Sequence, residues 1–156
     1  MKESSYAAIY RLMVAINKID GSYYLCARKL GAKENTLALL YALGDGRPHS
    51  QKQISEDWLI PKTTINTIVK ELADAGYLSL LATEDSREKT LRLTESGNDY
   101  AQRLLKRIYA VEQQALRRTL QKFPPEFVDA FDCFASCLCE EFQKQITGNA
   151  DTGQNE

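Results

Sequence analysis

The sequence has little of what most enzymes and membrane proteins need. Its 156 residues include one histidine, His49, which leaves few acid–base pairs for catalysis. It contains no nucleophile elbow, phosphate-binding loop or metalloprotease motif, so we expect no enzymatic activity. No apolar run approaches the length of a membrane span, and the N-terminus lacks the charged and apolar regions of a signal peptide. We therefore expect a cytoplasmic protein with no membrane partner.

Cysteine is also scarce, and the four cysteines do not form a recognisable metal site. Cys133 and Cys137 have a metal-compatible spacing of four, but Cys139 points elsewhere on a helix and His49 is remote in sequence. Zinc sites of this kind normally need four ligands. In a reducing compartment, cysteines on an apolar helix are usually small core residues, and Cys26 has only Arg28 and Lys29 nearby as activating groups. We expect no metal and no cofactor, and cysteine-based redox or metal sensing remains an alternative.

Net charge is nearly absent as well. The formal charge is −1, with 44% hydrophobic and 26% charged residues, which is typical of one soluble domain of this length. Between Asp45 and Arg92, seven Lys/Arg face eight Asp/Glu. This central region therefore lacks the overall basic excess that usually accompanies nucleic-acid binding.

What is present is a strong helix-turn-helix pattern between Ser50 and Gly76. Ser50 to Gln53 has the form of a capping box, which predicts the start of a short helix. A second helix is predicted from Pro61, because apolar residues recur on one face from Ile60 to Ala73. Gly76 ends this helix with a residue that tolerates positive φ. The two helices are separated by about three residues around Leu59.

A β-hairpin is predicted directly after the second helix. Residues 77–83 and 89–93 are β-prone, and a polar tip at residues 84–88 separates them. Thr94 then caps the following helix. A helix-turn-helix followed by a hairpin is a winged helix, so the predicted fold is mainly α with a small β-hairpin wing.

The polar face of the second helix is the candidate DNA-reading surface. Short hydrogen-bonding side chains and two lysines suit base edges and phosphates better than a smooth solvated surface. Asn66 is the best candidate for adenine, and the lysines are candidates for phosphate or guanine. An ordinary exposed helix face is the simpler alternative. The predicted contact residues are Lys62, Thr63, Thr64, Asn66, Thr67 and Lys70.

In order and spacing, these features resemble the MarR family, the multiple-antibiotic-resistance type of bacterial transcription regulators. The resemblance is carried by four segments, namely Ile65–Leu72, Gly76-Tyr77-Leu78, Asp85-x-Arg87 and Leu93-Thr94-x-x-Gly97. It implies a homodimer that binds double-stranded DNA at a pseudo-palindromic operator, which we expect to act as a repressor. It also implies release by a small aromatic or phenolic effector.

The wing supplies a second set of candidate DNA contacts. Arg87 suits a narrow, electronegative minor groove, and Asp85 can hold its guanidinium by a charge-assisted hydrogen bond. The resemblance implies the same roles. Ser86 and Lys89 complete the predicted wing contacts.

The resemblance implies an effector cleft between the dimerisation helices and the winged helix. Tyrosines on the first two predicted helices, with one arginine, could line an amphipathic pocket there. Residue by residue, core tyrosines with surface hydroxyls are the simpler explanation. The predicted pocket residues are Tyr10, Tyr23, Tyr24, Arg28 and Tyr41.

Helices are predicted on both sides of the winged helix. We expect a single domain, residues 1–156, in which helices at 6–30 and 98–146 dimerise and residues 33–97 form the DNA-binding lobe. The long helix from Thr94 ends near Lys122 because two prolines follow Phe123. A last helix, about 126–146, is expected to bury Phe127, Phe131, Phe134, Leu138 and Phe142. Residues 147–156 are expected to form a disordered tail.

The two C-terminal helices carry opposite charge. Residues 98–122 contain six Lys/Arg and two Asp/Glu, whereas residues 123–156 contain one Lys and seven Asp/Glu. Complementary packing would exploit this asymmetry, although solvated helix faces explain it equally well.

A rival hypothesis is a winged-helix protein-interaction module that does not bind DNA. The balanced local charge favours it, and so do Leu80 and Leu81, which stand where relatives often carry a basic residue. A steep salt dependence of DNA binding would speak against this rival.

Overall fold

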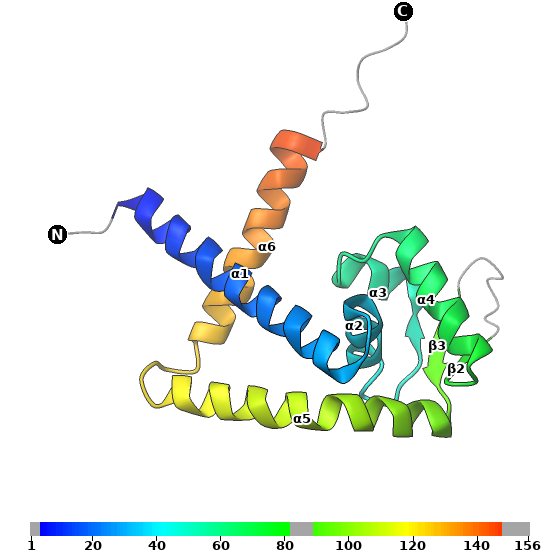
Figure 1. The fold of residues 1–156 in the computed structure, drawn as a ribbon. Coiled ribbons are helices and arrows are strands. Elements are labelled where there is room, and N and C mark those ends of the chain that lie inside the picture. Colours follow the sequence, from blue (N-terminus) through cyan, green and yellow to red (C-terminus); the bar gives the residue numbers. More distant parts are fainter. Residues whose placement is uncertain (1–3, 82–88, 148–156) are drawn as a thin grey trace, which may run out of the picture. The chain divides into compact units, whose positions relative to one another are not determined.

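The computed structural model describes residues 4–81 and 89–147 (Figure 1). Contacts divide the chain into two compact units, residues 1–109 and 110–156. The first unit holds α1 (Ser5–Leu30), α2 (Glu34–Ala42), β1 (His49–Ser50), α3 (Gln51–Asp57), α4 (Lys62–Asp74), β2 (Leu78–Leu81) and β3 (Thr90–Leu93). Helix α5 (Glu95–Leu120) begins in the first unit and ends in the second, which also contains α6 (Phe127–Phe142) and a π-helical turn, Gln143–Thr147. The predicted fold class, mainly helical with a small hairpin wing, is confirmed.

Several helices begin and end at the residues that the sequence marks. The Ser50 hydroxyl accepts a hydrogen bond from the Gln53 N–H at 3.3 Å and caps α3. The Thr94 hydroxyl accepts one from the Gly97 N–H at 3.0 Å and caps α5. Gly76 follows α4 with φ of 77°. These predicted boundaries hold because each depends on local hydrogen bonds.

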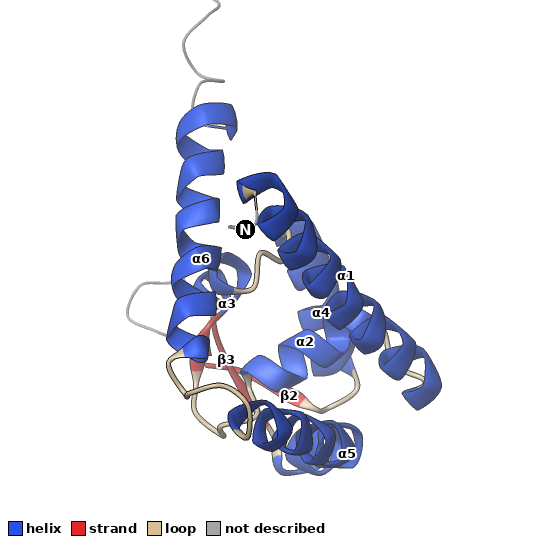
Figure 2. Cartoon of the chain, turned by 90° about the vertical axis from the view of Figure 1, so that its left-hand side faces the viewer, coloured by secondary structure: helices blue, strands red, loops and turns tan. Residues whose placement is uncertain are grey.

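The wing is a three-stranded antiparallel sheet in the order β1-β3-β2, drawn in red in Figure 2. The register pairs Leu78 with Leu93 and Leu81 with Thr90. On the other edge, His49 lies opposite Leu91. The sequence predicts only β2 and β3, because a strand of two residues has no periodicity to detect.

The hydrophobic core of the first unit lies between the helices and the sheet. Helices α2 and α4 contact each other, and α4 also contacts α3 and β2. The largest completely buried side chains are Leu39, Leu40, Leu43, Ile65, Leu91 and Leu105. Because Leu105 belongs to α5, the first half of α5 is part of this core. Among the described residues, no helix is both long and apolar enough to cross a membrane.

Helix α6 departs from its prediction. It begins at Phe127 as expected, but none of its residues is buried in the chain. Phe131 is 40% exposed and Phe142 51% exposed. The expectation that this helix buries its phenylalanines is therefore not met in the single chain. An apolar helical stripe predicts which face avoids water, and it does not identify the surface that covers the face.

Candidate nucleic-acid interface

Helix α4 separates an apolar face from a polar face. Ile65, Ile68, Val69 and Leu72 are buried in the core of the first unit. The predicted DNA-reading residues lie on the other side. Lys62, Thr63, Asn66, Thr67 and Lys70 are exposed, and Thr64 is half-buried. The structure therefore brings the predicted set together on one helix face, with the buried stripe fixing the rotation of the helix.

The turn between α3 and α4 is held by Ser55 and Ile60. The Ser55 hydroxyl donates to the Ile60 carbonyl at 2.6 Å, and the Ile60 N–H donates to the Ser55 carbonyl at 3.0 Å. Ile60 is buried, whereas Leu59 takes a left-handed φ of 50°. A non-glycine residue with positive φ is uncommon and marks a tightly constrained turn. The turn thus fixes where α4 begins relative to α3.

Asn66 is held by a side chain from the other helix. Gln51 Nε2 donates to Asn66 Oδ1 at 2.7 Å, and the Gln51 N–H donates to the Lys89 carbonyl at 2.8 Å. Gln51 therefore connects α3, α4 and the base of the wing. Its Oε1 is buried and has no hydrogen-bond partner among the described residues, which is an uncommon and costly state. With its oxygen engaged, Asn66 presents its NH₂ group as the readily available donor. The sequence does not reveal this link between residues fifteen apart.

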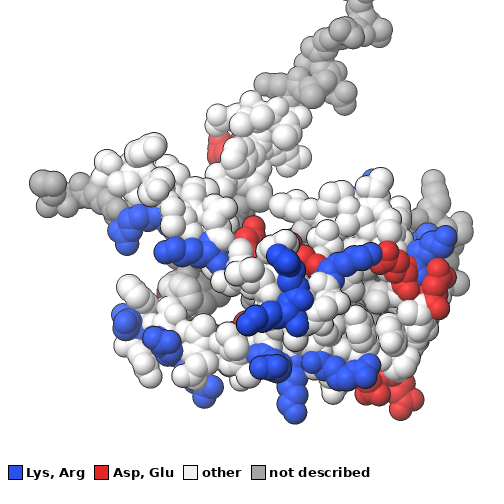
Figure 3. Space-filling view, viewed as in Figure 1, with Lys and Arg blue, Asp and Glu red and all other residues white. Residues whose placement is uncertain are grey.

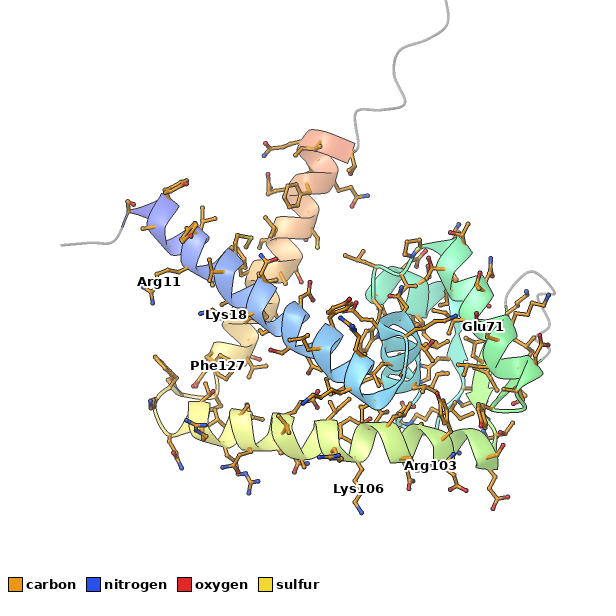
Figure 4. The ribbon with its side chains drawn as sticks, viewed as in Figure 1. Arg11, Lys18, Glu71, Arg103, Lys106 and Phe127 are labelled. Atoms are coloured by element: carbon orange, nitrogen blue, oxygen red, sulfur yellow. The ribbon has the colours of Figure 1, made fainter. Side chains whose placement is uncertain are left out.

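The cations on α4 have no carboxylate partner within the described part of the chain. Glu71, next to Lys70, is occupied by Lys33, whose Nζ lies 2.7 Å and 2.9 Å from the two carboxylate oxygens. Figure 4 shows Glu71 on the α4 side of the first unit. The charges of Lys62 and Lys70 therefore remain available for an external anion such as a phosphate.

A hydrogen-bonded loop precedes β1. Asp45 Oδ1 accepts from the Arg47 N–H at 2.9 Å and lies 2.8 Å from His49 Nε2. The hydrogen bond with His49 comes first, and the one from Arg47 second, among the interactions that lower the pKa of Asp45 below its ordinary value of 3.8. This pair fixes the segment that leads into β1 and the start of α3.

The base of the wing is packed against the start of α5. The Thr94 hydroxyl donates to the Gly76 carbonyl at 2.7 Å, and the Thr94 N–H donates to the Tyr77 carbonyl at 3.1 Å. A Cβ added at Gly97 would lie only 1.8 Å from the Tyr77 oxygen, so only glycine fits there. Close packing against the Tyr77 backbone therefore explains the glycine in the Thr94-x-x-Gly97 pattern. The predicted wing contacts Asp85, Ser86 and Arg87 lie outside the described residues, and Lys89 is exposed at the base.

The predicted effector residues fall into separate neighbourhoods of the first unit. The Arg28 guanidinium carbon lies 5.7 Å from the centre of the Tyr24 ring. Tyr41 contacts Trp58 and Tyr109, with ring centres 5.6 Å and 5.2 Å away. Tyr10 precedes Tyr24 by fourteen residues on α1, which is about 21 Å along the helix axis. One small ligand in one chain cannot contact both Tyr10 and Tyr24.

An open groove of about 610 Å³ lies elsewhere, along the first half of α5. Figure 4 shows Arg103 and Lys106 pointing outward from this helix, and Figure 3 shows Lys and Arg side chains gathered over it. The sequence alone does not predict this groove, although its residues on α5 recur on one exposed face of the helix. It is lined by Tyr77, Ser96, Asp99, Gln102, Arg103 and Lys106.

Part of the chain matches a model of the family that the sequence resembles. The MarR family model matches residues 31–88. The structure of NMB1585, a MarR family regulator from Neisseria meningitidis, superposes with a TM-score of 0.71 at 25% identity, covering 91% of this chain and 98% of that chain. No curated protein sequence matches the chain.

Two further solved structures share the fold at lower identity. The PcaV transcriptional regulator from Streptomyces coelicolor, in complex with its natural ligand, has a TM-score of 0.60 at 22% identity, covering 90% of this chain and 98% of that chain. Overoxidized AbfR bound to DNA has a TM-score of 0.60 at 16% identity, with the same coverage of both chains.

Proposed function

We propose that the chain is a winged-helix, DNA-binding transcriptional regulator of the MarR type, which represses transcription as a homodimer bound to a pseudo-palindromic operator. Regulators of this family are not enzymes. The observation that carries the proposal is the polar face of α4, whose two lysines lack carboxylate partners within the described residues and whose opposite side is anchored in the core.

Helix α4 is the element that enters the major groove. Asn66 donates its NH₂ group to a base acceptor, and Gln51 holds the amide in orientation before DNA arrives. Lys62 and Lys70 contact phosphate or guanine. An amide that is already oriented loses less conformational entropy on binding, so this arrangement favours sequence-specific contact.

The wing enters the adjacent minor groove. Arg87 makes the contact, with Asp85 orienting its guanidinium and with Ser86 and Lys89 on the flanking backbone. The described base of the wing supports this role. The paired register of β2 and β3 and the hydrogen bonds of Thr94 hold the hairpin in a fixed position on the first unit.

A second copy of the chain covers the exposed apolar residues of the flanking helices. In α1, Tyr6, Ile9 and Tyr10 are more than half exposed. In α6, no residue is buried, and the exposed side includes Phe131 and Phe142. Apolar surface of this kind on a soluble chain marks an interaction site. A two-fold axis would then place two recognition helices about 34 Å apart, in successive major grooves.

A small aromatic or phenolic effector weakens DNA binding by favouring a different separation of the two lobes. PcaV, a structural relative, was solved with its natural ligand. In this chain, the pair Tyr24–Arg28 and the cluster Tyr41–Trp58–Tyr109 offer aromatic surfaces. Because Tyr10 is far from Tyr24 along α1, it joins such a site only from the partner subunit.

One observation favours the rival function, a protein-interaction module without DNA binding. Leu80 and Leu81 on β2 are 50% and 38% exposed, an unusual feature for the edge of a DNA-binding wing. Salt dependence separates the two functions, because only phosphate contacts release counterions in proportion to their number.

The deciding experiment is fluorescence anisotropy on the DNA upstream of the protein's own gene, at two salt concentrations. Tight, salt-sensitive binding is expected. Asn66→Ala should cost about 1–3 kcal/mol on the specific site only. Lys62→Ala and Arg87→Ala should each weaken binding and lower the salt slope by about one.

The charge-matched control variants change exposed residues of α5. They are Lys106→Ala for the lysine and Arg107→Ala for the arginine. Both should leave the affinity for DNA and its salt slope unchanged. If the wild type binds this DNA no better than a random duplex, a selection from random operators follows. Failure of that selection as well would favour the interaction module.

A further inference from the structure

Helix α6 presents two thiols side by side, and the DNA-binding function uses neither. Cys133 and Cys137 are both exposed and lie one helical turn apart. At this spacing the two Cβ atoms are about 5–6 Å apart on the same helix face. The Cys133 thiol is close enough to raise the pKa of the Cys137 thiol. Cys139 lies about 200° around the helix from Cys137, so it cannot join the pair.

The geometry of the pair disfavours two common reactions of cysteine. A disulfide requires Cβ atoms about 3.5–4.5 Å apart, so oxidation within this helix would have to distort a turn. A structural zinc ion normally takes four ligands. Within the described residues, no group of three or more His, Cys, Asp or Glu side chains could hold a metal ion. The pair therefore suits a ligand in which a single atom forms bonds to both cysteine sulfur atoms.

The surroundings of the pair point in the same direction. The hydrogen bond with Cys133 raises the pKa of the Cys137 thiol, and the carboxylates of Glu140 and Glu141 add to this effect. The thiol therefore stays protonated at neutral pH and is a weak nucleophile towards oxidants and alkylating agents. Binding of a divalent metal would have to expel these protons, which costs free energy. A reaction that consumes neutral thiols carries no such cost.

We propose that Cys133 and Cys137 form a dithiol site for monosubstituted trivalent arsenicals, R–As(OH)₂. Two As–O bonds and two S–H bonds break, and two As–S bonds form. The two hydroxyl groups leave as water with the two thiol protons, and arsenic remains trivalent. Carbon occupies the third valence of arsenic, so the site needs no third protein ligand. Arsenic(III) is soft and prefers sulfur, as thiophilic metals do.

The test uses the reduced full-length protein, without DNA, and phenylarsine oxide as the probe. Mass spectrometry should show one phenylarsenic adduct per chain that survives excess glutathione and is removed by a dithiol. Cys139→Ser, the matched control on the same helix, should behave like the wild type. Cys133→Ser and Cys137→Ser should each bind roughly a hundredfold more weakly, because the second As–S bond is then no longer intramolecular.

Three results would overturn the site. They are retention of the adduct in both single variants, its loss in Cys139→Ser, and a wild-type adduct as labile to glutathione as that of Cys133→Ser. Circular dichroism checks that each variant keeps its helices, and Cys133→Ala provides a second substitution at the same position. Because the assay contains no DNA, its outcome is independent of the proposed repressor function.

Discussion

At the scale of single residues, two glycines within helices make opposite predictions. Gly97 leaves no room for a methyl group, since a Cβ there would lie 1.8 Å from the Tyr77 carbonyl oxygen. Gly97→Ala must move the base of the wing away from α5 and should destabilise the fold by about 3 kcal/mol. Gly21, in α1, has open space around it, so Gly21→Ala should stabilise by roughly 0.5–1 kcal/mol. Urea unfolding of both variants measures the two values, and shifts of the same sign would contradict this account.

Asp45 gives a prediction about pH. Its pKa is lowered in the folded chain by the hydrogen bond with His49 and by the Arg47 N–H. As the pH falls below the ordinary pKa of 3.8, the Asp45 carboxylate takes up its proton in unfolded chains before it does so in folded chains. The stabilisation is complete above that ordinary value and is lost below it. Asp45→Asn should thus be less stable than the wild type at pH 7, with the difference shrinking below pH 3.8.

The control for this prediction is Asp20→Asn, which changes an exposed carboxylate on α1. Denaturant midpoints at pH 7 and pH 3 should show no comparable change for that variant. A difference between Asp45→Asn and the wild type that stays constant between the two pH values would contradict the assignment.

At the scale of elements, the helix-turn-helix depends on Ser55. Its hydroxyl bonds the Ile60 carbonyl at 2.6 Å across a turn that contains a left-handed Leu59. Ser55→Ala leaves that carbonyl without its partner and should cost about 1 kcal/mol of stability. The start of α4 then becomes less well fixed, so affinity for the specific DNA should fall by more than affinity for a random duplex.

Ser22→Ala is the matched control for this turn. The Ser22 hydroxyl also bonds a carbonyl, that of Lys18 at 2.7 Å, but on the exposed surface of α1. Thermal unfolding and anisotropy together make the comparison. Equal effects of the two variants on DNA affinity would show that the turn does not position α4.

The elements also show what the sequence could predict and why the rest escaped it. Caps at Ser50 and Thr94 and the turn at Gly76 depend on neighbours within a few residues, so the sequence placed them correctly. The buried stripe of α4 followed from its period. Strand β1 was missed because two residues have no pattern. The link between Gln51 and Asn66 was missed because it arises only when the folded turn brings α3 onto α4.

At the scale of the whole molecule, the apolar residues of α6 are the largest difference between sequence and structure. The period of the sequence predicts an apolar face on a helix that the same sequence assigns to dimerisation. No residue of α6 is buried in the single chain, so the chain alone does not cover this face. The chain on its own leaves phenylalanines in water, at a cost that a second copy would remove on association. The symmetrical operator complex proposed above depends on that association.

Phe131→Glu tests this step directly. A carboxylate placed in the apolar face of α6 would be buried without a partner in the dimer, which is strongly unfavourable. Sedimentation velocity should show dimers for the wild type and monomers for this variant at the same micromolar concentration. Ser136→Glu adds the same charge about 140° around the helix from Phe131, away from the apolar face, and should remain dimeric. Each monomer reaches only one half-site, so Phe131→Glu should also lose most of its affinity for a two-fold operator while it keeps its α4 residues. A Phe131→Glu protein that stays dimeric would exclude this face of α6 from the interface, and the exposed apolar residues of α1 would be the next surface to mutate.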